Sequence, residues 1–260
     1  MEKFKPGDII CLTEKVHGTS SRNALTPVVR EKKNIFNRIF KTNGKKVINW
    51  EYAVGTRRTV VETLKSGYYG DNAFRIRWGE RFNGKLHDGE EVFGEIAGFT
   101  DDMVPIMGIV DNKKTNDKEF IKKYGDRTLF SYGCNEETKS RYFVYRMTCT
   151  TPDGYTIEYP WDLVKIRAEM MGLEVVPELE RFIYTTEEDF LARIQKWLDI
   201  PSTIDSSHVI EGVVVRALND TGFRVAKSKS YTFQVIEGII KAEANAPDME
   251  EAQEISNEDK

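Results

Sequence analysis

Long apolar runs are missing from this 260-residue sequence: no stretch of eighteen or more apolar residues occurs, and the opening segment MEKFKPGDII has no secretory-type apolar core. The three cysteines, Cys11, Cys134 and Cys149, form no Cys-x-x-Cys pair. These absences argue against a membrane span, an export signal, a disulfide framework and a zinc site built from cysteine pairs. The sequence therefore predicts a soluble protein of the reducing cytoplasm.

A surplus of positive charge is also missing, because 38 Lys and Arg stand against 42 Asp and Glu, for a net charge of -4. This balance argues against a protein that simply coats nucleic acid. The charge is unevenly distributed, however. Residues 30–58 hold nine basic and two acidic residues, whereas residues 243–260 hold seven acidic residues and one basic residue. The basic segment is either a solvated loop or a nucleic-acid contact, and the acidic segment is expected to be a disordered tail.

Strand patterns outnumber helix patterns. Runs rich in β-branched and aromatic residues predict strands at residues 9–13, 20–25, 91–96, 128–131, 142–150, 155–158, 209–215 and 223–226. Apolar residues at three- and four-residue spacing predict helices at 161–171 and 187–198, and a further helix is expected at 231–242. The mixture predicts an α+β domain of packed antiparallel sheets with flanking helices.

Charged side chains project from four of these apolar segments. Lys15 begins the run KVHG, Glu95 lies in the run FGEI, Glu211 begins the run EGVV, and the run KSK contains Lys227 and Lys229. Because residues two apart share one face of a strand, the last two ammonium groups point to the same place and repel each other unless an anion lies between them. A lysine at a strand end is by itself usually a solvated residue, so the predicted phosphate site depends on all four runs.

In their order and spacing these four runs resemble the motifs of the covalent nucleotidyltransferases, the superfamily of ATP-dependent ligases and mRNA capping enzymes. The nick-sealing RNA ligases, which include the phage double-strand RNA ligases, are the most similar family, over about Asp8 to Tyr231. The resemblance implies the nucleotidyltransferase fold and an ATP-dependent RNA ligase of RNA repair. Such an enzyme joins a 3′-hydroxyl to a 5′-phosphate of nicked or single-stranded RNA ends through lysyl-AMP and RNA-adenylate intermediates.

The resemblance also implies roles for the charged residues. Lys15 would attack the α-phosphorus of ATP and hold AMP through a phosphoramide bond. Lys227 and Lys229 would hold the phosphates while negative charge develops. Glu211, with Glu95, would bind Mg²⁺ or Mn²⁺, and Glu95 would also accept hydrogen bonds from the ribose.

Four further positions are implied to bind the nucleotide, each with an alternative. Glu14 would lie where the family reads adenine through its backbone, unless it is a solvated acid, and Tyr145 would stack on adenine, unless it is a core aromatic. His17, which stands where DNA ligases and capping enzymes usually have aspartate, would contact a phosphate or orient the cleft, unless it is a structural histidine. Arg58 would engage the nucleotide or the RNA end, with Arg57 as the alternative match.

Two positions depart from the family pattern. Ser20 stands where asparagine is common, and Arg146 stands where an acidic residue is common, so ribose or metal contacts are not implied at these places. Arg22 is open to two interpretations, a replacement hydrogen-bond donor or a surface strand residue.

The expected organisation is an adenylyltransferase domain at residues 1–242 with a basic insert at 30–58 and an acidic tail at 243–260, and no OB or other C-terminal domain. The insert carries Phe36, Phe40 and Trp50 among its charges and is expected to grip RNA by phosphate contacts and stacking, unless a partner chain supplies that grip. Three alternative functions stay open: a minimal ATP-dependent DNA ligase, a capping guanylyltransferase, and a non-catalytic RNA-binding protein on the same fold.

Overall fold

A computed structural model describes residues 3–32, 45–61, 73–219 and 222–240, and within them the chain forms twelve strands, five α-helices and one 3₁₀-helix. The strands are β1 (Ile9–Glu14), β2 (Thr19–Lys32), β3 (Lys45–Gly55), β4 (Glu90–Gly98), β5 (Val110–Asp111), β6 (Arg127–Thr128), β7 (Ser140–Thr150), β8 (Thr156–Glu158), β9 (Glu174–Val175), β10 (Glu178–Ile183), β11 (Gly212–Ala217) and β12 (Val225–Lys229). The helices are α2 (Ala73–Glu80), η1 (Asn112–Thr115), α3 (Lys118–Tyr124), α4 (Trp161–Met171), α5 (Glu187–Lys196) and α6 (Tyr231–Glu237).

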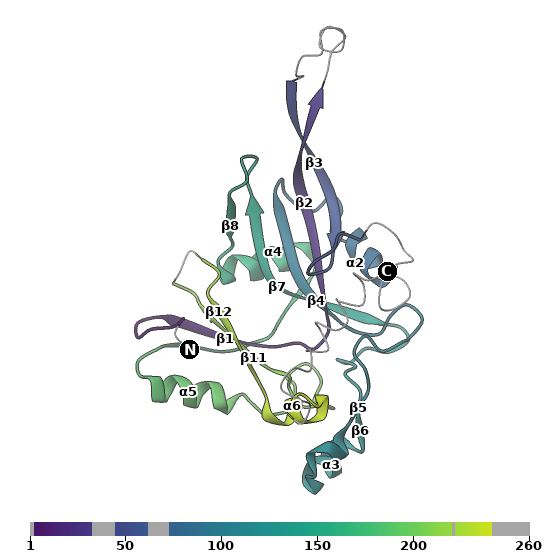
Figure 1. Cartoon of the computed structure of the whole chain (residues 1–260), viewed down its shortest axis with the longest axis vertical. Coiled ribbons are helices and arrows are strands. Elements are labelled where there is room, and N and C mark those ends of the chain that lie inside the picture. Colours follow the sequence, from purple (N-terminus) through teal and green to yellow (C-terminus); the bar gives the residue numbers. More distant parts are fainter. Residues whose placement is uncertain (1–2, 33–44, 62–72, 220–221, 241–260) are drawn as a thin grey trace.

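Two main sheets form the body of the molecule (Figure 1). The first has the strand order β10-β1-β11-β12, and the second has the order β3-β2-β4-β7-β8. All pairs are antiparallel except that of β9, which runs parallel to β7. The predicted α+β class with antiparallel sheets and flanking helices is therefore confirmed.

Strand β1 is buried on both faces because its alternate side chains enter two different cores. Ile10 and Leu12 pack in one core cluster with Phe190 of α5, whereas Cys11 belongs to a second cluster that includes residues of α2 and α4. β1 thus lies between the two cores, and Lys15, the residue that follows it, lies at their junction.

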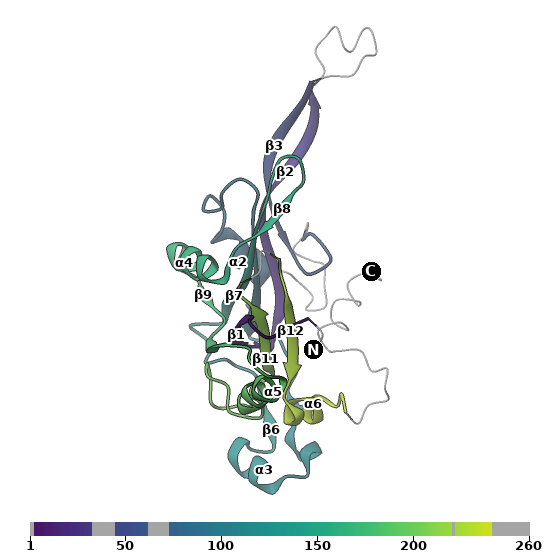
Figure 2. The same cartoon turned by 90° about the vertical axis from the view of Figure 1, so that its left-hand side faces the viewer.

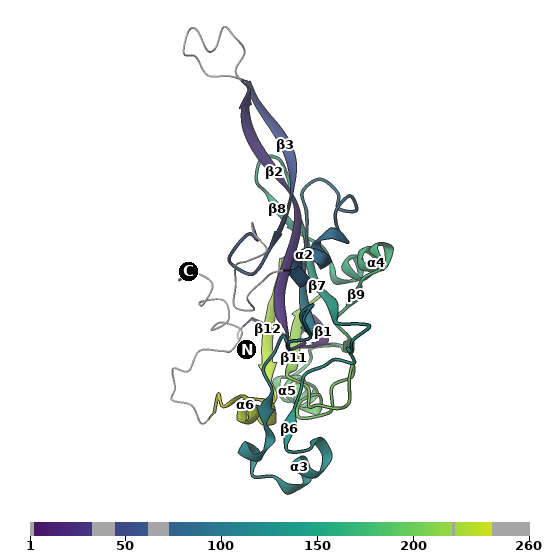
Figure 3. The same cartoon turned by 90° about the vertical axis from the view of Figure 1, so that its right-hand side faces the viewer.

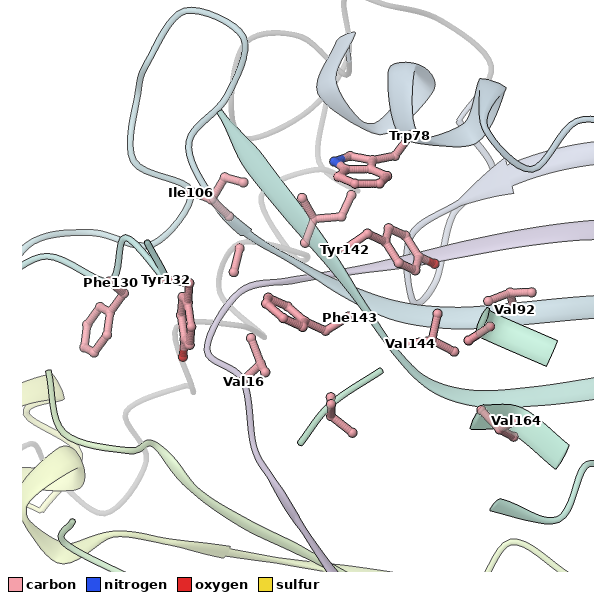
Figure 4. Packing of buried hydrophobic residues seen from close by; sticks show 14 of the residues in the cluster. Val16, Trp78, Val92, Ile106, Phe130, Tyr132, Tyr142, Phe143, Val144 and Val164 are labelled. Carbon is pink, nitrogen blue, oxygen red and sulfur yellow. The ribbon is translucent and has the colours of Figure 1, made fainter. Parts of the chain in front are cut away.

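The second core holds the chain immediately after that lysine. Val16 belongs to the same cluster as Tyr132 and Phe143, whose ring centroids are 6.2 Å apart (Figure 4). The loop that joins β1 to β2 is therefore anchored by apolar burial and not only by its polar groups.

Strands β2 and β3 form a long hairpin that extends from the body (Figure 2 and Figure 3). They pair from Arg22 opposite Gly55 out to Lys32 opposite Lys45, whereas β4 pairs with β2 only from Thr19 to Ala24. The outer part of the hairpin is therefore a two-stranded ribbon.

Several predicted elements need correction. The described part of the basic segment is not a solvated loop but strand, because the β-branched and aromatic residues of β3 favour an extended chain. The predicted strand at 128–131 is reduced to Arg127–Thr128, since Phe130 is buried in the core without a partner strand. The predicted strand at 209–215 begins only at Gly212 and ends at Ala217.

The helix predicted at 161–171 is confirmed, and the helix predicted at 187–198 ends at Lys196. The helix expected at 231–242 ends at Glu237, with Gly238 in the left-handed conformation as its cap. The sequence patterns did not predict α2, α3, β3 or β10. The expected tail at 243–260 lies outside the described residues, as do Phe36 and Phe40 of the basic insert. Among the described helices none is long and apolar enough to cross a membrane.

Candidate active site

The loop between β1 and β2 is held at three points, and these fix the position of Lys15. The Lys15 amide donates to the carbonyl of Gly212 at 2.9 Å, and the His17 amide donates to the hydroxyl of Tyr132 at 2.6 Å. Gly18 passes so close to β4 that an added Cβ would lie 2.4 Å from the carbonyl oxygen of Ile96. Glycine is required there because of this close approach, which brings the loop against β4 as well as β11.

The Lys15 side chain ends in a buried cluster of charges around Glu211. Its Nζ lies 2.6 Å from a Glu211 carboxylate oxygen, and Nζ of Lys229 lies 3.6 Å from the same oxygen. Burial raises the pKa of the Glu211 carboxyl, but the positive charges of Lys15, His17 and Lys229 outweigh burial and bring that pKa to about 2. Glu211 is therefore ionised at neutral pH.

His17 lies behind this carboxylate, in an enclosed site. Its Nδ1 is 3.6 Å from Glu211 and its Nε2 is 3.4 Å from Glu237, while the rings of Phe130 and Phe233 approach its faces at centroid distances of 4.7 and 4.9 Å. Burial lowers the pKa of His17, but hydrogen bonds and charges from the two carboxylates raise it to about 9. The imidazole is therefore cationic at neutral pH.

A cavity of about 410 Å³ opens in front of Lys15, between the two main sheets. The first sheet and the second sheet both line it, the first with Thr13, Arg216 and Lys227 and the second with Arg22, Glu95 and Tyr145. This volume lies within the range of roughly 300–1,000 Å³ that small-molecule sites occupy.

Most of the charged residues in the cavity wall are cationic. Arg146 lies over the rings of Phe93 and Phe223, at 4.4 Å from each centroid, and its Nε donates to Glu158 at 2.9 Å. Arg146 thus stacks on two rings and pairs with an acid, at a position where the nick-sealing RNA ligases commonly have an acidic residue. With Lys15, Arg22, Arg57, Arg216 and Lys227, it makes the cavity suited to an anion with several phosphates.

The other predicted site residues fall into two groups. Glu95, Tyr145 and Lys227 line the cavity with Lys15, whereas His17, Glu211 and Lys229 are not part of the lining and form the layer behind Lys15. That position of His17 favours the structural interpretation over a direct phosphate contact.

Glu14 is not a solvated acid, so that alternative is wrong. It is 1% exposed, and its carboxylate accepts hydrogen bonds from the Ser202 hydroxyl at 2.6 Å and from the Thr203 amide at 2.9 Å. Burial raises the pKa of Glu14, against these hydrogen bonds, which lower it. The carboxylate thus ties the end of β1 to the segment before β11.

The neighbouring arginines at the end of β3 are placed differently. Both are exposed, but Arg57 lines the cavity and Arg58 does not contribute to the lining. The structure therefore favours the alternative match, Arg57, as the arginine at the cavity.

Arg216 was not predicted from the sequence. It is 6% exposed, its guanidinium lies 4.3 Å from the Trp161 ring centroid, and its Nη1 donates to the carbonyl of Tyr145 at 3.0 Å. Burial lowers the pKa of this guanidinium to about 10, so it keeps its charge at neutral pH. The feature of the sequence that could have indicated this residue is a single arginine inside the apolar strand GVVVRA.

No group of three or more His, Cys, Asp or Glu side chains suited to a metal ion occurs among the described residues. The carboxylates close to Lys15 are Glu95, at the cavity, and Glu211, behind it. Mg²⁺ binds one or two carboxylates and takes its other ligands from water and phosphate oxygens, and of these two carboxylates that of Glu95 lines the cavity.

Comparison with known proteins gives one family match. A family model described as RNA ligase matches residues 8–231. A search of curated proteins finds no match. Among solved structures, a mutant of Naegleria gruberi RNA ligase with ATP and Mn is similar at 14% identity and a TM-score of 0.48, over 88% of this chain and 51% of that chain. Naegleria gruberi RNA ligase with PPi is similar at 14% identity and a TM-score of 0.48, over 90% of this chain and 52% of that chain. The present chain thus spans about half the length of those proteins.

Proposed function

Because this chain belongs to the RNA ligase family, we propose that it is an ATP-dependent RNA ligase that joins a 3′-hydroxyl to a 5′-phosphate. The observation that carries the proposal is Lys15, buried beneath a cavity with cationic walls and backed by the charge cluster around Glu211. One of the Naegleria gruberi RNA ligase structures contains ATP and Mn, and we propose the same class of ligand for this cavity. Use of ATP and RNA implies an intracellular site of action.

In the first step, the neutral amine of Lys15 attacks the α-phosphorus of ATP. A nitrogen–phosphorus bond forms, the bond to the pyrophosphate oxygen breaks, and the amine loses its proton to solvent. The ion pair with Glu211 stabilises the protonated form of Lys15, whereas attack requires the neutral amine. Other cations must therefore balance the charge of the Glu211 carboxylate while Lys15 is neutral. Lys229 and His17, each 3.6 Å from Glu211, supply that compensation.

The cavity residues bind the nucleotide around that centre. Lys227 and the wall arginines hold the phosphates as negative charge develops in the transition state. Glu95 accepts hydrogen bonds from the ribose hydroxyls, and Tyr145 stacks on the adenine. Glu95 and Glu211 are the residues that would hold a divalent ion, which supplies further neutralisation of phosphate charge.

Two further steps complete the reaction on the same residues. A 5′-phosphate oxygen of RNA attacks the phosphorus of lysyl-AMP, the nitrogen–phosphorus bond breaks, and Lys15 regains a proton. The 3′-hydroxyl then attacks the 5′-phosphorus of the RNA-adenylate: an oxygen–phosphorus bond forms, the hydroxyl proton goes to solvent, and AMP leaves with the electron pair of the broken bond. Glu211 again stabilises the restored ammonium.

The proposal is tested by the intact mass of the protein after incubation with ATP and Mg²⁺, with GTP in parallel and Lys15→Met as the control. We expect the mass of one AMP to be added with ATP only, and not in the variant. Absence of the adduct in protein shown to be free of bound AMP would contradict the ligase function and favour a non-catalytic RNA-binding protein. An adduct with GTP alone would favour a capping enzyme.

Nicked RNA and nicked DNA of the same sequence then identify the polynucleotide. We expect sealing of RNA, with RNA-adenylate accumulating when the 3′-hydroxyl is replaced by hydrogen. Equal or faster sealing of DNA would favour the minimal DNA ligase.

A further inference from the structure

The outer part of the β2–β3 hairpin pairs with no third strand that the structure describes. Its base contacts the body through Leu25, whose carbonyl accepts from the Gly89 amide, and Tyr52, whose hydroxyl donates to the Gly79 carbonyl. We define the arm as residues 25–32 of β2 and 45–52 of β3, which lie beyond the last residue of β2 that pairs with β4. Eight residues per strand give the arm a length of about 26 Å. It extends away from the sheets in all three views (Figure 1).

The end of the arm carries a concentration of positive charge. Arg30, Lys32, Lys45 and Lys46 are all exposed there; Arg30 pairs with Glu51, and the acid Glu31 lies opposite Lys46 in the register. Lys32 and Lys45 lie directly opposite each other in the register, and neither makes an ion pair with any residue that the structure describes. Like charges directly opposite each other destabilise a hairpin, so this pairing is unfavourable in the free protein and favourable when a polyanion lies across it.

The base of the arm joins the cavity. Arg22 pairs in register with Gly55, and Arg22 and Arg57 both line the cavity in front of Lys15. Basic residues therefore lie at both ends of the ribbon, at the cavity and at the end of the arm, and the charged residue described between them is Glu51, which pairs with Arg30. The ten residue steps from Arg22 to Lys32 span about 33 Å, which is on the order of ten nucleotide steps.

We propose that the arm binds the sugar–phosphate backbone of the RNA whose end is being joined, up to about ten nucleotides from the joint. This inference rests on the proposed ligase function and adds to it where the substrate lies. Phosphate contacts of this kind increase affinity for RNA without selecting a sequence. The net charge of the whole chain is -4, so long-range attraction of RNA must come from a local surface such as this one.

The test compares two triple variants of the full chain. The arm variant is Lys32→Gln with Lys45→Gln and Lys46→Gln, and the matched control is Lys118→Gln with Lys122→Gln and Lys123→Gln in α3. Both sets are exposed, and α3 lies at the end of the molecule opposite the arm (Figure 1). Both variants lose the same charge, and thermal unfolding confirms that each is folded.

RNA affinity is measured with nicked duplexes of increasing length and at several salt concentrations. For the wild type we expect affinity to rise with length until the duplex extends about ten nucleotides from the joint, since that is the reach of the arm. The arm variant should lose this length dependence, and its plot of log affinity against log salt should be less steep by about 0.7 to 0.9 for each lysine that contacts a phosphate. The control should behave as the wild type.

Equal affinity, salt slope and length dependence in the arm variant and the wild type would overturn the proposal. So would a larger loss of affinity in Val29→Ser with Ile48→Ser, because these exposed residues lie opposite each other on the face away from Lys32 and Lys45, and such a loss would indicate binding through apolar contact. Lysyl-AMP formation is measured alongside: its absence in the wild type counts against the proposed function, whereas the RNA titrations still decide the role of the arm.

Discussion

Nε2 of His17 lies 3.4 Å from the carboxylate of Glu237, on the side of the imidazole opposite Glu211. Glu237 is in α6, beyond the residues that the family model matches. A residue outside the matched region thus completes a buried chain from Lys15 through Glu211 and His17. This contact stabilises the cationic imidazole that compensates the charge of Glu211.

The first prediction concerns the stability of the protein against pH. Burial alone would lower the pKa of His17, but in the folded protein the carboxylates of Glu211 and Glu237 raise it from 6.5 to about 9. Burial lowers the pKa of the nearby His208, and the charge of His17 lowers it further. A raised histidine pKa stabilises the fold fully below pH 6.5, and that contribution is lost as the pH rises to about 9. Its upper limit is on the order of 3 kcal/mol.

Glu237→Gln removes one of the two carboxylates, so we expect a smaller decrease in the free energy of unfolding over this pH range than in the wild type. Urea titrations at steps between pH 6 and 9.5 measure the difference. Because other groups titrate similarly in both proteins, the wild-type curve is the control, and parallel curves would contradict the prediction.

The second prediction concerns the close approach of Gly18 to β4. In Gly18→Ala the new Cβ would lie 2.4 Å from the Ile96 carbonyl oxygen and 3.0 Å from Cγ of Glu95, so the loop or the glutamate must move. We expect lysyl-AMP formation to slow by on the order of 10- to 100-fold, since small displacements of reacting groups are costly. The rate of mass gain with ATP measures it.

Gly108→Ala is the matched control for this change, because a Cβ there meets nothing within 4 Å and the backbone is not left-handed. It should form lysyl-AMP at the wild-type rate. Equal rates in the two variants would show that the contact with β4 does not position the nucleophile.

The third prediction distinguishes the roles of Arg57 and Arg58, the two adjacent arginines that follow β3. Arg57→Gln removes a charge from the cavity wall, whereas Arg58→Gln removes one outside it. A hydrogen bond to a charged group contributes about 1.5–3 kcal/mol, so we expect about a 10- to 100-fold loss in the affected step for Arg57→Gln only. Single-turnover rates of adenylylation and of RNA-adenylate formation identify that step, and an equal loss in both variants would favour the original assignment to Arg58.

The sequence alone was sufficient for the class of fold and for the family. Lys15, Glu95 and Glu211 are recognisable because each is a charge beside or within an apolar strand, a pattern that local sequence displays. The resemblance to RNA ligases is confirmed by the family match, and the nick-sealing subtype stays a prediction. The two-residue period of a strand also predicted that Lys227 and Lys229 act from one side of β12.

The sequence did not predict which residues meet across the two sheets. Glu237 reaches His17, Ser202 binds Glu14, and Arg216 packs on Trp161 only because segments far apart in the chain are brought together. Such contacts depend on strand register and on the packing of the cores, and no local pattern carries that information.

What the amino-acid sequence indicated by itself was therefore the local chemistry: a candidate lysine nucleophile, candidate carboxylates and candidate phosphate-binding lysines, each with a characteristic neighbourhood in the chain. Only the tertiary structure decided that Arg57 and not Arg58 lines the cavity, that Glu14 is buried, and that the described part of the basic segment belongs mainly to the β2–β3 ribbon. The reason is physical, since burial and charge pairing arise between segments and are set when the two sheets pack against each other.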